Sequence, residues 1–242
     1  MDAPPFRIVG TPRFGGILVV ADHASNRVPA DIDLGIDPAL LGQHIAVDIG
    51  VAGVAERLEQ RPGFAAFLAE VSRLVCDFNR DEGAPAIVPV ASDGHAIPGN
   101  DLSHAVREAR LDRFFRPYHA ALARTLEETP PALILSLHSF TPKLASDPGQ
   151  QRPWQVGVLY NEDDRAARIA ISLLEGEGLI VGDQQPYSGK LLNATMNRHA
   201  EADRRPYLGI EIRQDEIVTA AGQAEWAERL GRICGAVARD LA

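Results

Sequence analysis

Four short polar stretches of this sequence contain side chains that could hydrolyse an amide bond with the help of a metal ion. They occupy residues 22–26, 77–80, 136–140 and 209–214, and each ends an apolar run or lies within one. Together they supply imidazoles for a metal ion, an asparagine and an arginine for a carboxylate, and a glutamate that could carry a proton. This combination is typical of a zinc-dependent amide hydrolase.

Two histidines are the first candidate metal ligands. His23 follows the apolar run 17–20, and His138 follows the apolar run 133–137 with serines nearby on both sides. Because parallel strands lie about 5 Å apart, histidines at the ends of neighbouring strands could converge on one metal ion, and the serine hydroxyls could hold the His138 imidazole. A structural role, such as capping a turn, is the alternative for each histidine taken alone.

A third protein ligand is needed, because a catalytic zinc site has three of them and one open position. Asp48 is the one charged residue in the apolar segment 45–52, which the spacing predicts to be helical, and His44 lies one helical turn before it. A carboxylate in such surroundings needs a partner, so Asp48 could bind the metal or pair with His44 or an arginine. Asn26 is the competing ligand, although a neutral amide binds zinc poorly.

Asn79 and Arg80 are the candidate carboxylate-binding residues, at the end of the apolar run 74–78. A guanidinium binds a carboxylate through two hydrogen bonds, and a neighbouring amide adds a third. Arg73 lies just upstream and offers a second cation for an oxyanion or another carboxylate, and Arg198 is a further predicted substrate contact. For Asn79 and Arg80, a surface turn is the alternative.

Glu211 is the candidate proton carrier. It lies between two isoleucines, and the alternation of a strand places it on the opposite face from both. A glutamate in a mostly buried strand needs a partner or has a raised pKa. Next to a metal-bound water it would act as a general base and then pass the proton to the leaving nitrogen. A salt bridge to Arg213, two residues further on, is the alternative.

The cysteines and the remaining histidines have no predicted chemical role. Cys76 and Cys234 each lack a second cysteine close by in sequence, so we expect two buried free thiols. His199 receives no assignment. The other histidines are expected on the surface or in helix packing: His95, His104 and His119.

The composition favours one acidic globular domain spanning residues 1–242. The hydrophobic share is 45%, and the chain has no repeat, linker or change of composition. The net charge of -9 argues against nucleic acid or an anionic membrane as a partner. Residues 1–9 lack a basic segment followed by an apolar core, and no apolar run approaches the roughly 20 residues that span a bilayer, so we expect a cytoplasmic protein.

Alternating strand and helix patterns predict an α/β three-layer sandwich around a mixed, largely parallel sheet. Strands are predicted at residues 17–20, 65–69, 73–78, 132–137, 156–160 and 207–212. Helices are predicted at residues 38–60, 103–128 with a kink or break at Pro117, 165–177 and 223–241, and loops at residues 22–37, 81–100, 187–189 and 195–199. In such sheets, sites form beyond the carboxyl ends of the strands.

These segments, in their order along the chain, resemble the N-formylglutamate amidohydrolase family over residues 17–230. The resemblance is carried by residues 20–23, 44–48, 71–80, 138–140 and 210–215. The order is also similar to that of the zinc carboxypeptidases, which have a histidine and a glutamate, then Asn-Arg, then His-Ser-Tyr, then Glu-Leu-Arg. The resemblance implies a sheet like theirs, with these roles: His23 and His138 as zinc ligands, Asn79 and Arg80 as carboxylate-binding residues, and Glu211 as the base.

The sequence departs from the carboxypeptidase pattern at Asn26, where that pattern has glutamate, so the third ligand stays open between Asp48 and Asn26, with Asp48 favoured. The resemblance implies one Zn²⁺ per chain and hydrolysis of an N-acyl amino acid, with N-formylglutamate giving glutamate and formate. Arg73 or the metal would then stabilise the oxyanion. The same ligands also suit iron, cobalt or manganese. Two alternatives are a deacylase of another N-acyl amino acid and a protein that binds carboxylates without metal.

Overall fold

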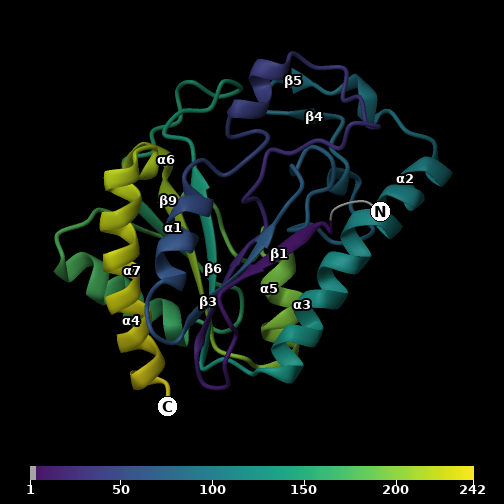
Figure 1. The fold of residues 1–242 in the computed structure, drawn as a ribbon. Helices are drawn as coiled ribbons and strands as arrows, with labels where there is room; N and C mark the ends of the chain where they lie inside the picture. Colours follow the sequence, from purple (N-terminus) through teal and green to yellow (C-terminus); the bar gives the residue numbers. More distant parts are fainter. Residues whose placement is uncertain (1–3) are drawn as a thin grey trace.

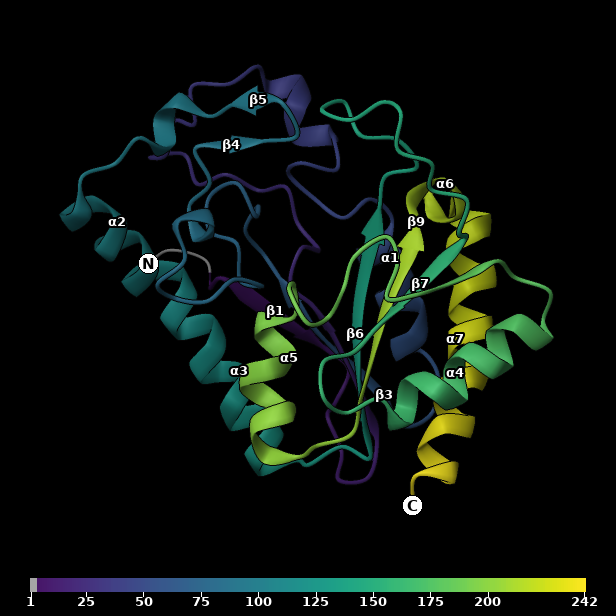
Figure 2. The ribbon, with the colours of Figure 1, turned by 180° about the vertical axis from the view of Figure 1, so that it is seen from behind.

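The computed structural model describes residues 4–242 and shows a β-sheet between two layers of helices (Figure 1 and Figure 2). Residues 1–3 lie outside that range, and they belong to the segment 1–9 that was considered above as a possible targeting sequence. The strands of the sheet are β1 (Phe6–Val9), β2 (Ile17–Ala21), β3 (Phe64–Ala69), β6 (Leu133–Phe140), β7 (Val156–Leu159), β8 (Val181–Asp183) and β9 (Tyr207–Arg213). A separate hairpin pairs β4 (Ala91–Ser92) with β5 (His95–Ala96).

The sheet is mixed and largely parallel, as predicted. Among the described residues its seven strands lie in the order β1-β3-β2-β6-β9-β7-β8. The central strands β3, β2, β6 and β9 are parallel to one another. β1 runs antiparallel to β3, and β7 runs antiparallel to β9. The carboxyl ends of the four central strands therefore meet at one edge of the sheet.

Helices cover both faces of this sheet. They are α1 (Val51–Glu59), α2 (His104–Arg110), α3 (Arg116–Glu128), α4 (Arg165–Gly176), α5 (Ala194–His199), α6 (Gln214–Ile217) and α7 (Ala220–Asp240). α1, α4 and α7 pack on one face, and α3 and α5 pack on the other (Figure 1). Val19 and Ala21 of β2 enter the first core, whereas Leu18 and Val20 enter the second. Because both faces are covered, β2 and β3 are apolar throughout, whereas β6 and β9 also contain polar residues toward their carboxyl ends.

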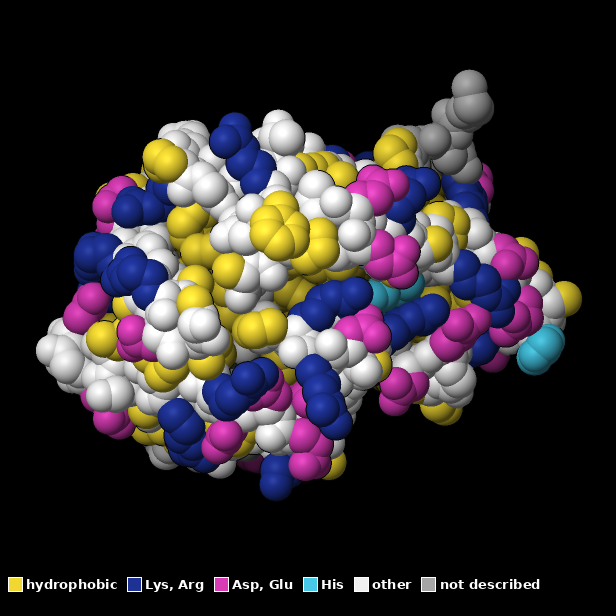
Figure 3. Space-filling view, turned by 90° about the horizontal axis from the view of Figure 1, so that it is seen from below, with side chains coloured by type: hydrophobic (Ala, Val, Ile, Leu, Met, Phe, Trp, Pro, Cys, Tyr) yellow, Lys and Arg dark blue, Asp and Glu magenta, His cyan; other side chains and the backbone are white. Residues whose placement is uncertain are grey.

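The surface at the amino ends of the parallel strands carries acidic and basic side chains next to one another (Figure 3). Neither sign of charge dominates this face. Within residues 4–242, no helix combines the length and the apolar character needed to cross a membrane.

Most predicted elements are confirmed within a few residues, namely the strands at 17–20, 65–69, 132–137, 156–160 and 207–212 and the helices at 165–177 and 223–241. The helix predicted over residues 103–128 is divided, because a π-helical segment, Leu111–Phe115, separates α2 from α3, with Pro117 in the first turn of α3. The short elements β1, β8 and α6 were not predicted. α5 occupies residues predicted as a polar loop, which is a correction. Both cysteines are buried and free, as predicted.

The predicted helix over residues 38–60 is wrong in its first half. Pro38–Gly42 forms a short 3-10 helix, and α1 begins only after a series of turns. Gly50, the residue before α1, has a φ of 83°, a left-handed conformation that a continuing helix does not allow. His44 and Asp48 therefore lie in a loop and not on one face of a helix.

The predicted strand over residues 73–78 is also wrong. These residues follow bends and turns, and Ser72 fixes their start by donating from its hydroxyl to Ala46 O at 2.8 Å and accepting from Leu74 N at 3.2 Å. The run is apolar because its side chains enter the core between the sheet and α3. A short buried run has the same composition in a strand and in an irregular segment.

Candidate active site

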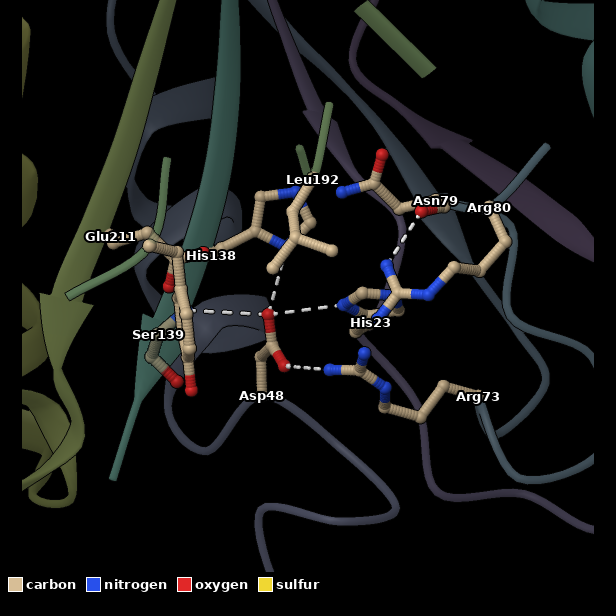
Figure 4. Close-up of a pocket in the computed structure, with 10 residues that line it drawn as sticks. His23, Asp48, Arg73, Asn79, Arg80, His138, Ser139, Leu192 and Glu211 are labelled. Carbon is tan, nitrogen blue, oxygen red and sulfur yellow. Dashed lines mark hydrogen bonds and ion pairs between the residues drawn. The ribbon is translucent and has the colours of Figure 1, made fainter. Parts of the chain in front are cut away.

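Most of the predicted site residues come together in a cavity at the carboxyl ends of the parallel strands (Figure 4). His23 follows β2, whereas His138 in β6 and Glu211 in β9 lie side by side on adjacent strands. Irregular segments before α1 and after β3 supply Asp48, Arg73, Asn79 and Arg80. The cavity has a volume of about 90 Å³ and is lined by His23, Asp48, Arg73, Asn79, Arg80, His138, Ser139, Tyr187, Leu192 and Glu211.

His23, Asp48 and His138 form a buried cluster that could hold a metal ion. Asp48 Oδ2 lies 3.3 Å from His23 Nδ1 and 2.9 Å from His138 Nδ1. The three ligand atoms all lie within 4.8 Å of one another, and the two imidazole rings are 5.0 Å apart between centroids. Two imidazole nitrogens and one carboxylate oxygen that converge in this way fit the ligand set of a catalytic zinc ion.

Of the two alternative partners considered for Asp48, His44 and an arginine, only the arginine contacts it. His44 Nε2 lies 3.0 Å from Asp93 Oδ2 instead. Asn26, the competing ligand, donates from its amide to a backbone carbonyl at 3.0 Å and does not line the cavity. Arg73 Nη1 does lie 3.4 Å from Asp48 Oδ1. Asp48 thus directs one oxygen to an arginine and the other to both histidines, which favours it over Asn26 as the third ligand.

A second carboxylate stands behind each histidine of the cluster. His23 Nε2 lies 2.7 Å from Asp77 Oδ1, and His138 Nε2 lies 3.6 Å from Asp22 Oδ2. Asp22 Oδ1 in turn accepts from the Tyr118 hydroxyl at 2.7 Å. A carboxylate that accepts the Nε2 proton leaves the Nδ1 lone pair free for a metal ion, as in many zinc sites. Neither Asp22 nor Asp77 was predicted to support a histidine, although both are lone acids beside apolar runs, as Asp48 is.

Charges in the cluster compensate one another. Burial opposes ionisation of Asp48, but the positive charge of His23 and the hydrogen bond from His138 outweigh it and hold the pKa of Asp48 well below its ordinary value. Burial disfavours protonation of His138, yet the close contacts with Asp22 and Asp48 and their negative charges raise its pKa well above the ordinary value. A divalent cation would replace such protons, because metal binding to imidazoles releases them.

Glu211 faces the cluster as predicted. Burial, followed by the negative charge of Asp48, raises the pKa of Glu211 to about 7, although the positive charge of His138 acts in the opposite direction. Its Oε2 atom is buried and has no hydrogen-bond partner among residues 4–242. The alternative salt bridge is not formed, because Arg213 pairs with Asp215 at 2.7 Å. Glu211 is therefore a buried acid that changes protonation near neutral pH.

Arg73, Asn79 and Arg80 line the opposite side of the cavity (Figure 4). Arg73 Nη2 donates to Asp77 Oδ2 at 2.8 Å, and although burial acts against it, the charges of Asp77 and Asp48 raise the pKa of Arg73. Arg80 Nη1 donates to the carbonyl of Asn79 at 2.8 Å. The amide nitrogen of Asn79 points toward the cavity (Figure 4). Two guanidinium groups and an amide are thus available to an anionic substrate.

Arg198 lies outside this cavity, so the structure gives no support to the predicted substrate contact. Its side chain is 49% exposed, and Nη1 lies 4.0 Å from Glu82 Oε2. Tyr187 and Leu192 line the cavity but were not predicted. They come from the chain between β8 and α5, where the sequence shows only a turn-rich loop. Burial, with the charge of Glu211, raises the pKa of Tyr187.

His119 and His199 form a buried pair behind the cavity, although no functional role was predicted for either. His119 Nδ1 lies 2.9 Å from His199 Nε2, and the two rings are stacked. Burial and the charge of His199 lower the pKa of His119 to about 3. Burial and the charge of Arg198 lower the pKa of His199 to about 4, and Asp22 acts against this shift in both rings. Both rings are therefore neutral near pH 7.

Acid should weaken the fold through this pair. An unfolded histidine has a pKa of about 6.5, so below this pH the unfolded chain binds more protons than the folded protein. The stabilisation from neutral His119 and His199 is complete above about pH 6.5 and is lost as the pH falls toward 4. Between pH 7 and pH 5 we expect a loss of about 2 kcal/mol per histidine in the free energy of unfolding.

Urea unfolding at the two pH values measures this loss. The double variant His119→Gln/His199→Gln cannot take up these protons and should lose correspondingly less stability than the wild type. His104→Gln, a change at an exposed histidine, is the control and should behave as the wild type does. An equal loss in the double variant and the wild type would contradict the prediction.

Comparisons with known proteins agree with this site. A sequence model described as N-formylglutamate amidohydrolase matches residues 15–218. A gene product of Agrobacterium tumefaciens with a solved structure is 30% identical at a TM-score of 0.90, with 97% of this chain and 95% of that chain covered. A search of curated proteins found no match.

More distant structures share the fold. The N-formylglutamate amidohydrolase from Ralstonia eutropha is 21% identical at a TM-score of 0.73, with 99% of this chain and 98% of that chain covered. A bacteriophage poly-gamma-glutamate hydrolase is 11% identical at a TM-score of 0.50, with 98% and 91% covered. The sequence match to residues 15–218 includes every residue that lines the cavity. This chain belongs to the N-formylglutamate amidohydrolase family.

Proposed function

We propose that this protein is a zinc-dependent amidohydrolase that converts N-formylglutamate and water to formate and glutamate. The observation that carries the proposal is the position of Glu211, a buried acid with an unpartnered oxygen, beside the cluster of His23, Asp48 and His138. Membership of the family supports the choice of an N-acyl amino acid as substrate.

The metal would be held by His23 Nδ1, Asp48 Oδ2 and His138 Nδ1, one ion per chain. When bound, zinc supplies a Lewis acid that polarises the acyl carbonyl and lowers the pKa of a coordinated water. Asp77 and Asp22 hold the two imidazoles in the orientation that this needs, since they face the Nε2 atoms. Other divalent ions that accept nitrogen and oxygen ligands are expected to bind as well.

Glu211 is the proposed general base and general acid. Its Oε2 atom is buried and unpartnered among the described residues, and its side chain lines the cavity beside the cluster, which suits both roles. Oε2 accepts a proton from the attacking water as the bond from oxygen to the acyl carbon forms. The same atom then gives the proton to the nitrogen as the carbon–nitrogen bond breaks. Arg73 is the proposed cation that stabilises negative charge on the acyl oxygen.

Asn79 and Arg80 are the proposed binding site for a substrate carboxylate. The Asn79 amide nitrogen faces the cavity, and Arg80 lies beside it on the cavity wall, so both can donate hydrogen bonds to one carboxylate.

Release of formate and glutamate by the zinc-loaded protein tests this function. N-formylglutamate is compared with N-acetylglutamate, N-succinylglutamate and N-formylaspartate, and we expect the highest kcat/KM for N-formylglutamate. Preference for another acyl group would mean a related deacylase. Absence of turnover across this panel in protein that contains one zinc per chain would contradict the proposal.

A further inference from the structure

We propose that His119, His199 and Thr195 are positioning residues that hold Asn79 in the orientation needed to bind a substrate carboxylate. The proposal rests on the proposed function of Asn79 and Arg80. It does not give these three residues any contact with substrate. They act from behind the cavity wall, on the segment that contains Phe78 and Asn79.

This segment is held from two helices. The Phe78 carbonyl lies 3.0 Å from His119 Nε2 of α3 and accepts from Thr195 Oγ1 of α5 at 3.2 Å. The side-chain oxygen of Asn79 accepts from Thr195 N at 3.1 Å. His119, Thr195 and His199 are at most 4% exposed. Water therefore competes little for these hydrogen bonds.

The direction of each hydrogen bond follows from the groups that share it. A carbonyl only accepts, so His119 Nε2 must carry a proton and donate to Phe78 O. In a neutral ring, Nδ1 of His119 is then an acceptor, and it receives the Nε2 proton of His199 at 2.9 Å. Both histidines thus have one fixed tautomer, and the chain of hydrogen bonds ends on the residue before Asn79.

The Asn79 amide is fixed in one orientation as a result. The Thr195 N–H can pair with the amide oxygen but not with the amide nitrogen, so the NH₂ group is directed into the cavity (Figure 4). In the flipped orientation an oxygen would face the substrate carboxylate and repel it. The backbone N–H of Thr195 therefore decides whether Asn79 attracts or repels this group.

His119 also has a neighbour that supports the other half of the site. Tyr118 donates to Asp22 at 2.7 Å, and Asp22 lies 3.6 Å from His138. Tyr118 and His119 lie in the first turn of α3, directly after the π-helical segment Leu111–Phe115. Such segments often occur at functional sites. One helical turn thus supports the metal ligands through Tyr118 and the carboxylate-binding residues through His119.

The test compares two substitutions of His119 in zinc-loaded protein. His119→Leu removes both hydrogen bonds, whereas His119→Gln keeps one N–H donor and one acceptor. We expect His119→Leu to raise KM for N-formylglutamate and the dissociation constant of glutamate by on the order of 10-fold, with kcat changed less than about 3-fold. His119→Gln should restore both values to within about 3-fold of the wild type, and zinc content should stay at one per chain in both.

Further variants separate positioning from packing and keep the test decisive. Thr125→Val, at another buried hydroxyl of α3 that bonds only within its own helix, should leave KM unchanged. Thr195→Val removes just the hydroxyl bond to Phe78 and should weaken glutamate binding in the same way, even if His119→Leu does not fold. The dissociation constant of glutamate, measured by calorimetry, tests the proposal even if N-formylglutamate is not the substrate. Wild-type glutamate affinity in Thr195→Val and His119→Leu, or a loss confined to kcat, would overturn it.

Discussion

Replacing Glu211 with glutamine should lower kcat for N-formylglutamate by about 10²- to 10⁴-fold, the usual contribution of a general acid–base group. Glutamine has the size of glutamate but cannot accept a proton at the position of Oε2. The wild-type side chain has this atom buried and unpartnered among the described residues. The rate is measured as formate release by zinc-loaded protein, and KM should change much less than kcat, because the group acts mainly in the transition state.

Two measurements keep this result from being explained by a damaged site. Zinc content should remain one per chain in Glu211→Gln, since the three proposed ligands are unchanged. Glu201→Gln is a matched control, because Glu201 is a half-buried acceptor for the Tyr207 hydroxyl, away from the cavity, and its kcat should equal that of the wild type. Full activity of Glu211→Gln would show that another group moves the proton.

The sequence was sufficient to predict the residues that follow or lie within long apolar strands. β2, β6 and β9 are buried on both faces, so their runs are unambiguous. Alternating strands and helices predict a largely parallel sheet, whose strand ends meet at one edge, so His23, His138 and Glu211 were expected near one another. The proximity of these three residues was predicted from the expected sheet alone, without any side-chain contacts.

The irregular segments could not be predicted in the same way. Asp48 was expected on a helix, but the left-handed turn at Gly50 places it in a loop whose path depends on packing against other segments. Arg73 was expected on a strand, but the run that follows it is buried without being extended. Their positions in the cavity rest on contacts between residues far apart in sequence, such as that of Asp48 with Arg73.

The buried pairs behind the cavity left no pattern in the sequence. His119 and His199 lie 80 positions apart, and each has ordinary helical neighbours. Asp22 and Tyr118 are similarly distant, at 96 positions. Hydrogen bonds of this kind require the packing of α3 and α5 on the sheet to be known first, so the supporting residues of the site were missed although its cavity-lining residues were mostly found.

Substitution of Asp48 by asparagine should abolish high-affinity zinc binding and reduce kcat/KM by more than about 10³-fold. A neutral amide is a poor ligand for zinc, and Asp48 Oδ2 is the oxygen that both histidine Nδ1 atoms face. The change also removes the negative charge that, with Asp22, favours a cationic His138. Buried His138 would then lose one of the two carboxylates that stabilise its positive charge, so the metal-free variant should also be less stable than the metal-free wild type.

Thermal unfolding with and without zinc measures the effect of each substitution on zinc binding. At a free zinc concentration of 100 times Kd, binding stabilises the wild type by about 2.7 kcal/mol, which should raise Tm by about 5 to 10 °C for a chain of this size. The shift should be near zero for Asp48→Asn. Asp77→Asn keeps the three ligands but changes the partner of His23 Nε2 and of Arg73 Nη2, and it should weaken zinc binding by about 10- to 100-fold.

The comparison between these variants decides the identity of the third ligand. Asp183→Asn is the control, because this carboxylate pairs with Arg168 and Tyr160 outside the cavity, and it should show the wild-type zinc shift. If Asp48→Asn still bound one zinc per chain with wild-type affinity, Asn26 or another residue would have to complete the ligand set. We expect the loss of zinc affinity to be greatest in Asp48→Asn, smaller in Asp77→Asn and absent in Asp183→Asn. This order is expected only if Asp48 binds the metal directly and Asp77 acts through His23.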